Sequence, residues 1–224
     1  MKKPVKGIDD NRILTFNQKT FLNEFIKSEL KDVFRLSGGT ALSAFYLEHR
    51  FSEDLDFLSK ENVPLTVLES FLKSISIVED IFFTKLFDRN IFNLKIKDKS
   101  FLKVEFTATS LINLEDNVLI DHLIVDSFLD IIVNKLCAIA DRFEAKDYVD
   151  VYCALKDCDL SLKELMPLAE KKCGIKGIRY VLESRLLQIP DGIDKLQLRI
   201  SLTEDDIRTF FEKYIIDIIS DKKL

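Results

Sequence analysis

The sequence is poor in the residues that mark many enzyme classes: its 224 residues include 6 glycines, 4 prolines and 2 histidines. Few glycines and prolines are typical of a globular protein rich in helix, and the length suffices for one large domain or two small ones. No GxSxG, HExxH or zinc-ligand pattern is present, which argues against the common hydrolase and zinc-protein motifs. The one Gly-Gly pair is not followed by Gly-Lys-Ser/Thr, which excludes a P-loop.

Cysteine is also scarce, and the four cysteines form no CxxC pair. They lie within apolar stretches typical of helices and are Cys137, Cys153, Cys158 and Cys173. Buried free thiols are therefore preferred over disulfides or a zinc site, and free thiols suit a reducing cytoplasm.

Long apolar runs are missing as well. No stretch approaches the roughly 18 apolar residues of a membrane span, and the N-terminus, residues 1–4, lacks the apolar region of a signal peptide. We therefore expect a soluble, cytoplasmic protein with no membrane partner.

Basic residues do not outnumber acidic ones, and the formal net charge is −5. Any nucleic acid would have to be met by a local basic patch, since the field of the whole molecule does not attract it. One cluster could contact RNA phosphates, although such clusters are usually solvated surface. It consists of Lys171, Lys172, Lys176 and Arg179.

The first half of the chain alternates between helical and strand-like periodicity. Helices are predicted over 17–30, 40–46 and 64–72, and strands over 34–36, 54–58, 81–87, 91–96 and 101–107. This order of elements predicts an α+β fold with a mixed β-sheet and flanking helices.

From about residue 127 the pattern is helical only. Helices are predicted over 128–155 (one long helix or two abutting ones), 160–173, 178–187 and 205–219. We therefore place a boundary near Asp126, with a sheet domain over 1–126 and an all-helical C-terminal domain over 127–224.

Two acidic residues are the first candidate for chemistry. Asp54 and Asp56 are two apart on a predicted strand, so both carboxylates project from the same face. Like charges held this close repel unless a cation lies between them, and Mg²⁺ prefers such oxygen ligands. A DxD pattern alone is common, and a solvated acidic strand end is the alternative.

A glycine turn precedes the acidic pair. Gly38, Gly39 and Thr40 follow a predicted strand and open a predicted helix that Thr40 can cap. Backbone N–H groups and the helix dipole can bind phosphate there. A phosphate-binding turn followed by a metal-binding strand predicts a site for a nucleoside triphosphate and its Mg²⁺.

These motifs together resemble a known family. Leu36-Ser37-Gly38-Gly39-Thr40-Ala41-Leu42 followed by Asp54-Leu55-Asp56-Phe57 resembles the minimal nucleotidyltransferases of the DNA polymerase β superfamily. The fuller pattern, with His49-Arg50-x-Ser52 before Asp54, resembles the AbiEii/AbiGii toxin family. That family's second signature is matched in register by Lys135, Ala138, Arg142, Lys146, Asp147 and Asp150.

The resemblance implies an Mg²⁺-dependent enzyme that transfers a nucleotide from an NTP to an RNA acceptor, above all a tRNA 3′ end. It also implies a toxin of a type IV toxin–antitoxin or abortive-infection system, with a co-encoded antitoxin as partner. Lys135 and Asp150 would be the family's catalytic pair, and Asp147 would be structural.

The second signature also has a geometric interpretation. On one continuous helix, Lys135, Arg142, Lys146 and Asp150 fall within an arc of about 80°. Such a stripe is usually a solvated face. Beside a DxD site, its three cations could instead contact a triphosphate or RNA, and Lys135 and Arg142 are the residues that we expect to bind the nucleotide.

Two further residues complete the prediction. Polymerase β-type sites often add a third carboxylate from a later strand, and Glu105 is the candidate, with an exposed strand face as the alternative. His49 is expected to be structural or close to the nucleotide.

Two other functions remain open at this point. The same fold could transfer AMP to a protein, which the acidic net charge allows. The chain could also be an inactive nucleotide-binding or partner-binding module, although the intact Asp54, Asp56, Lys135 and Asp150 argue against that.

Overall fold

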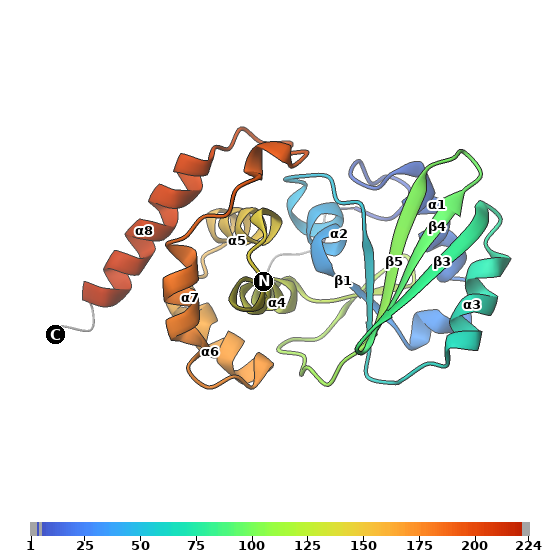
Figure 1. The fold of residues 1–224 in the computed structure, drawn as a ribbon, viewed down its shortest axis with the longest axis horizontal. Coiled ribbons are helices and arrows are strands. Elements are labelled where there is room, and N and C mark those ends of the chain that lie inside the picture. Colours follow the sequence, from blue (N-terminus) through green and yellow to red (C-terminus); the bar gives the residue numbers. More distant parts are fainter. Residues whose placement is uncertain (1–3, 5, 221–224) are drawn as a thin grey trace. The chain divides into compact units, whose positions relative to one another are not determined.

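The computed structural model describes residue 4 and residues 6–220, and Figure 1 shows their fold. The chain divides into two compact units, which are described separately below. Among the described residues, the sheet unit holds those up to Ser110 together with 116–127, and the helical unit holds 111–115 and those from Phe128 on. No helix within the described residues is long and apolar enough to cross a membrane.

The sheet unit is built on one seven-stranded sheet with the order β3-β4-β5-β2-β1-β7-β6. The strands are β1 (Arg35–Ser37), β2 (Leu55–Ser59), β3 (Val78–Leu86), β4 (Arg89–Ile96), β5 (Phe101–Ala108), β6 (Val118–Ile120) and β7 (Leu123–Val125). The β2–β5 and β1–β7 pairs are parallel and the other pairs antiparallel, so the predicted mixed sheet is confirmed.

Three helices accompany the sheet: α1 (Phe16–Phe25), α2 (Gly38–Leu42), which continues into a π-helical turn (Ser43–Leu47), and α3 (Leu65–Ser74). A 3₁₀ turn spans Glu29–Asp32. A capping box formed by Thr15 and Gln18 starts α1.

One face of the sheet carries the hydrophobic core of this unit. Phe57 on β2 is fully buried, and its ring centroid lies 4.3 Å from that of Phe25 on α1 and 5.2 Å from that of Phe106 on β5. Phe71 on α3 packs edge-on against Phe25. Because side chains alternate along a strand, the residues on either side of Phe57 point to the opposite, more polar face.

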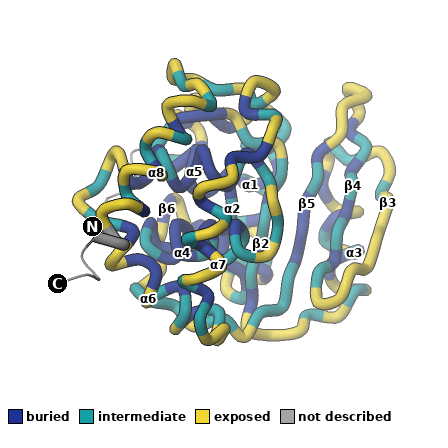
Figure 2. The backbone as a smooth tube through the Cα atoms, turned by 60° about the vertical axis from the view of Figure 1, so that its left-hand side comes forward, coloured by how far each residue is buried: buried dark blue, intermediate teal, exposed yellow. Residues whose placement is uncertain are grey.

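The helical unit consists of α4 (Phe128–Asp141), α5 (Ala145–Asp157), α6 (Leu162–Cys173), α7 (Ile178–Leu186), a 3₁₀ turn (Ile193–Lys195) and α8 (Glu204–Ser220). Helix α4 is central, since it packs against α5, α6 and α7. Its Ile131, Leu136 and Ile139 have no exposed surface. Figure 2 shows how much of α4 and α5 is buried.

Several predicted elements differ from the structure. Helix α1 ends at Phe25, five residues earlier than expected, and the strands β6 and β7 were not predicted. Of the two alternatives for 128–155, one long helix or two abutting ones, the structure has two helices, separated by the non-helical residues 142–144. The single helix face that was expected to carry Lys135 and Asp150 therefore does not exist.

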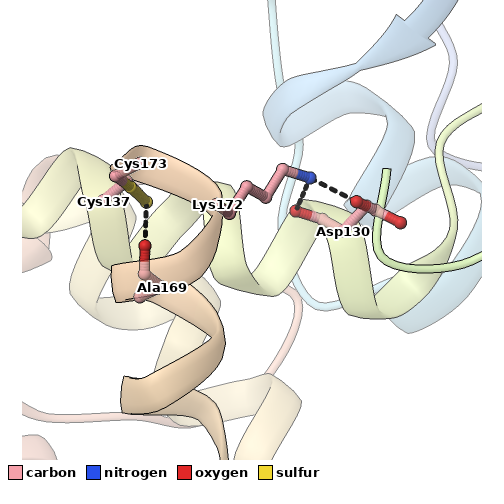
Figure 3. Close-up of a disulfide and its surroundings, with 5 residues drawn as sticks. All are labelled: Asp130, Cys137, Ala169, Lys172 and Cys173. Atoms are coloured by element: carbon pink, nitrogen blue, oxygen red, sulfur yellow. Dashed lines mark hydrogen bonds and ion pairs between the residues drawn. A yellow bond between two sulfur atoms is a disulfide. The ribbon is translucent and has the colours of Figure 1, made fainter. Parts of the chain in front are cut away.

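The expectation of four free thiols was wrong for one pair. Cys137 on α4 and Cys173 at the end of α6 form a disulfide, with their Cα atoms 6.6 Å apart (Figure 3). The two cysteines are 36 residues apart in sequence, so only the packing of α6 against α4 brings them together. Cys153 and Cys158, which are both among the described residues, are not disulfide-bonded.

The proposed basic cluster is not a patch of four exposed cations. Lys172 is buried and pairs with Asp130 (Figure 3). The Asp130 carboxylate also accepts hydrogen bonds from the backbone N–H groups of Leu114 and Glu115. Arg179 pairs with Glu183. Only Lys171 and Lys176 are exposed, so Lys172 anchors the 111–115 segment instead of presenting charge to RNA.

Candidate active site

The two aspartates lie where the sequence predicted them. Asp54 immediately precedes β2 and Asp56 lies within it, and both are partly exposed, whereas Leu55 between them is fully buried. The carboxylates therefore share the polar face of the sheet. In the β1–β2 pair Ser37 is opposite Asp56, which brings the end of β1 next to the acidic pair.

The glycine turn fits closely around charged side chains. A Cβ atom at Gly38 would overlap the carboxylate of Asp56, and one at Gly39 would overlap the guanidinium of Arg50. Gly38 also has a positive φ of 71°, which is strained for other residues. The two glycines are therefore needed for an acidic and a basic side chain to approach the start of α2.

We expect Gly38→Ala to lower nucleotidyl transfer at least about 10-fold, because the new methyl group displaces the Asp56 carboxylate from its position. The left-handed conformation adds a stability cost of about 1–2 kcal/mol. Gly174→Ala is the matched control, since Gly174 has a φ of 67° but nothing within 4 Å of the added Cβ. Steady-state kinetics and urea unfolding of both variants test this. Equal activity of Gly38→Ala and Gly174→Ala would contradict it.

Thr40 has a different place from the one expected. Helix α2 begins at Gly38, with Ser37 at its N-cap position, so Thr40 does not cap it. Thr40 is fully buried, and its hydroxyl donates a hydrogen bond to the backbone carbonyl of Asp54. It thus holds the entry to β2 in place against α2.

Lys103 on β5 is a member of the site that sequence reasoning missed. Its Nζ lies 2.9 Å from the Asp54 carboxylate. Partial burial acts to lower the pKa of Lys103, but the hydrogen bond and charge of Asp54 and the charges of Asp56 and Glu105 outweigh it and raise that pKa. An ammonium held in this way shows that the acidic face attracts a cation.

Glu105 is neither exposed nor isolated. It lies opposite Asp56 in the parallel β2–β5 pair and is buried. Arg89 on β4 binds both of its carboxylate oxygens, at 2.5 and 2.6 Å, and the Thr107 hydroxyl donates to it at 2.9 Å. The Glu105 carboxylate is therefore next to the acidic pair but is bound by Arg89, and the alternative of an exposed strand face was wrong.

The acidic pair fits a magnesium ion of the kind that substrate phosphates help to coordinate. Within the described part of the chain no three His, Cys, Asp or Glu side chains are grouped as a metal-binding set. Mg²⁺ in phosphoryl-transfer enzymes is commonly held by one or two carboxylates, together with water and phosphate oxygens. Asp54 and Asp56 supply two partly exposed carboxylates on one face, which matches that donor set.

The second signature forms a buried charge cluster in the helical unit. Lys135 on α4 lies 2.8 Å from the carboxylate of Asp147 and 2.7 Å from that of Asp150, both on α5. Asp147 also accepts hydrogen bonds from Arg142 at 2.8 and 3.2 Å. Both aspartates are fully buried and Lys135 is nearly so. This cluster joins α4 to α5 and is not a solvated stripe.

The charges within the cluster depend on one another. Burial alone would raise the pKa of Asp147, but the charge of Lys135 and the hydrogen bond and charge of Arg142 outweigh it and lower that pKa. Lys146, in contrast, pairs at 3.0 Å with the partly exposed Glu144. Of the three cations predicted to share a face, Lys146 alone stands apart from the buried aspartates.

The predicted site residues thus form two groups, each within its own unit. Gly38, Gly39, Thr40, Asp54, Asp56 and Glu105 belong to the sheet unit, and Lys135, Arg142 and Asp150 belong to the helical unit. Arg50, Arg89 and Lys103 were not predicted as site residues. The position of Lys103 could have been inferred only from the register of β5 against β2.

Comparisons with known sequences point to one family. The sequence profile of the family described as "Nucleotidyl transferase AbiEii toxin, Type IV TA system" matches residues 20–221. The uncharacterized protein aq_aa25 of Aquifex aeolicus (strain VF5) is 29% identical over 209 residues, covering 91% of this chain and 97% of that protein.

Solved structures support the fold. One crystal structure of a protein from Helicobacter pylori matches with a TM-score of 0.62 at 22% identity, covering 93% of this chain and 97% of that one. JHP933 from Helicobacter pylori matches with a TM-score of 0.58 at 21% identity, covering 92% of this chain and 94% of that one. At these identities the likeness establishes the fold alone.

Proposed function

The chain belongs to the AbiEii nucleotidyltransferase toxin family, and from this premise we propose that it transfers a nucleotide from a Mg²⁺-bound NTP to the 3′ end of an RNA, above all a tRNA. The observation that carries the proposal is the placement of Asp56 over Gly38, with Asp54 beside it on the same sheet face. Carboxylates next to a glycine turn at a helix start suit a metal–triphosphate substrate.

Each residue of the sheet unit has a role in this proposal. Asp54 and Asp56 would hold Mg²⁺, which when bound supplies Lewis-acid stabilisation of the charge on the transferring phosphoryl group. The backbone N–H groups of Gly38 and Gly39 would bind phosphate oxygens. Lys103, now paired with Asp54, would keep the acidic face partly neutralised before substrate enters.

Lys135 and Asp150 take their proposed roles from the family signature. By the family resemblance, Lys135 would neutralise charge that develops during transfer, and Asp150 would orient or deprotonate the attacking hydroxyl. The contacts support a positioning role for the aspartates, because the Lys135 ammonium lies within 2.8 Å of both Asp147 and Asp150. A buried ammonium held by two carboxylates has little freedom to reorient.

The acceptor is tested by labelling. The protein is incubated with each α-³²P-labelled NTP, Mg²⁺ and either total bacterial RNA or a bacterial protein extract. We expect label in the tRNA fraction, removable by 3′ exonuclease, because the proposed acceptor is an RNA 3′ hydroxyl. Label in protein alone would favour the AMP-transferring alternative, which the acidic net charge of −5 allows. Label in neither fraction would contradict the proposed function.

We also propose that the enzyme is the toxin of a two-protein system and that a co-encoded antitoxin neutralises it. The support is the family description, which names a toxin of a type IV system. Toxicity would arise because a nucleotide added to a tRNA 3′ end prevents aminoacylation.

A further inference from the structure

The polar face of the sheet carries two phenylalanines that the core does not use. Phe82 on β3 is 50% exposed and Phe101 on β5 is 64% exposed, and their ring centroids are 6.4 Å apart. On the opposite face Phe92 and Phe106 are fully buried. A neighbouring pair of exposed rings beside a polar site is a surface suited to flat, aromatic ligands.

A cross-strand row connects this pair to the acidic site. Lys103 pairs with Asp54, Asn93 lies opposite Lys103 in the β4–β5 register, and Phe82 lies opposite Asn93 in the β3–β4 register. All four residues therefore share one face. With neighbouring strands about 4.8 Å apart, Phe82 lies three strand spacings, or about 14 Å, from Asp54.

The row leads to the edge of the sheet. β3 is the first strand of the sheet, and Figure 2 shows it exposed along most of its length. A ligand that lies along the row can therefore enter from the β3 side and end at Asp54. We call Phe82, Asn93, Phe101 and Lys103 the stacking face.

The side chains of the stacking face match single-stranded nucleic acid. Exposed aromatic rings stack on bases of any sequence. Asn93 and Lys103 offer an amide and an ammonium between the rings and the carboxylates, where a base edge or a phosphate would lie.

We propose that the stacking face binds the single-stranded 3′-terminal nucleotides of an RNA acceptor, with bases against Phe82 and Phe101. This inference deepens the proposed function, since it rests on an RNA as the acceptor. The nearby cations are matched by carboxylates, as Arg89 pairs with Glu105 and Lys95 with Glu79. Stacking therefore provides most of the affinity, and the dependence on salt is shallow.

The test is direct binding of a 5′-fluorescein-labelled, unstructured RNA 12-mer with a free 3′ hydroxyl, followed by fluorescence anisotropy without NTP. Phe82→Ala and Phe101→Ala should each raise the Kd about 5-fold to 150-fold, the range for loss of one stacked base. Phe87→Ala is the matched control, because Phe87 is 87% exposed but lies in the β3–β4 turn, off the row. The wild-type Kd should rise less than about 10-fold between 50 and 200 mM salt.

Three outcomes overturn the inference. One is a folded Phe82→Ala/Phe101→Ala variant that binds the 12-mer like wild type. A second is a wild-type protein that does not bind the 12-mer. The third is a double variant that binds RNA like wild type but sediments as a monomer where wild type sediments as a dimer. That result would make this face a protein interface.

The inference and the proposed function can fail separately. If wild type labels RNA and the double variant has an unchanged KM for RNA, the function stands and the stacking face is wrong. If RNA binding depends on both rings but no NTP labels RNA, the stacking face stands and the proposed reaction is wrong.

Discussion

Replacement of Asp56 by alanine is expected to reduce nucleotidyl transfer by about 10³-fold or more. The carboxylate is one of the two that we assign to Mg²⁺, and metal stabilisation of a phosphoryl transition state is worth several kcal/mol. The variant should stay folded, because Asp56 is partly exposed and its loss relieves repulsion with Asp54. Single-turnover kinetics at saturating NTP and RNA measure the loss.

Asp88→Ala is the control for this variant, since Asp88 is an exposed aspartate of the β3–β4 turn and has no proposed role. The same pair of variants tests the toxin role: wild type and Asp88→Ala should arrest bacterial growth when expressed alone, and Asp56→Ala should not. Full activity of Asp56→Ala would remove the metal assignment. Growth arrest by Asp56→Ala would separate toxicity from this site.

Replacement of Lys135 by alanine is expected to lower the free energy of unfolding by about 3–5 kcal/mol. The change removes the cation that binds Asp147 and Asp150, both of which are fully buried. Arg142 still pairs with Asp147, but this contact does not replace the ammonium that Lys135 places next to Asp150. Urea unfolding followed by circular dichroism measures the effect.

Lys146→Ala is the matched control, because Lys146 pairs with the partly exposed Glu144 and not with the buried aspartates Asp147 and Asp150. Its effect on stability should be below about 0.5 kcal/mol. Activity of Lys135→Ala is then compared per folded molecule, since a stability loss alone also lowers turnover. An unchanged unfolding midpoint in Lys135→Ala would contradict the buried cluster.

The sheet could be predicted from the sequence wherever polar and apolar residues alternate along a strand. Asp54-Leu55-Asp56-Phe57 shows the period of two that puts the aspartates on one face and Leu55 and Phe57 in the core. β6 and β7 have only three residues each, too few for a periodic signal. The sequence did not decide whether 128–155 forms one helix or two, because residues 142–144 include no glycine or proline to mark the end of a helix.

The site was predictable in its residue types and less so in its contacts. Asp54, Asp56 and Gly38 are local in sequence, so their proximity follows from a strand, a turn and a helix. The pairing of Lys103 with Asp54 and of Arg89 with Glu105 depends on strand register, which the sequence does not specify. The burial of Lys135 and Lys172 likewise depends on helix packing, because a lysine in a helix is normally assigned to the surface.

The central claim is that Asp54 and Asp56 bind a metal–nucleotide complex, and calorimetric titration with a non-hydrolysable NTP analogue tests it most directly. Wild type should bind the analogue at least about 10-fold more tightly with Mg²⁺ than with EDTA, because Asp54 and Asp56 would hold the ion and its charge would favour the phosphates. Asp54→Asn and Asp56→Asn should lose this difference while remaining folded. Equal affinity of wild type with and without Mg²⁺, or an undiminished metal effect in both variants, would contradict the account.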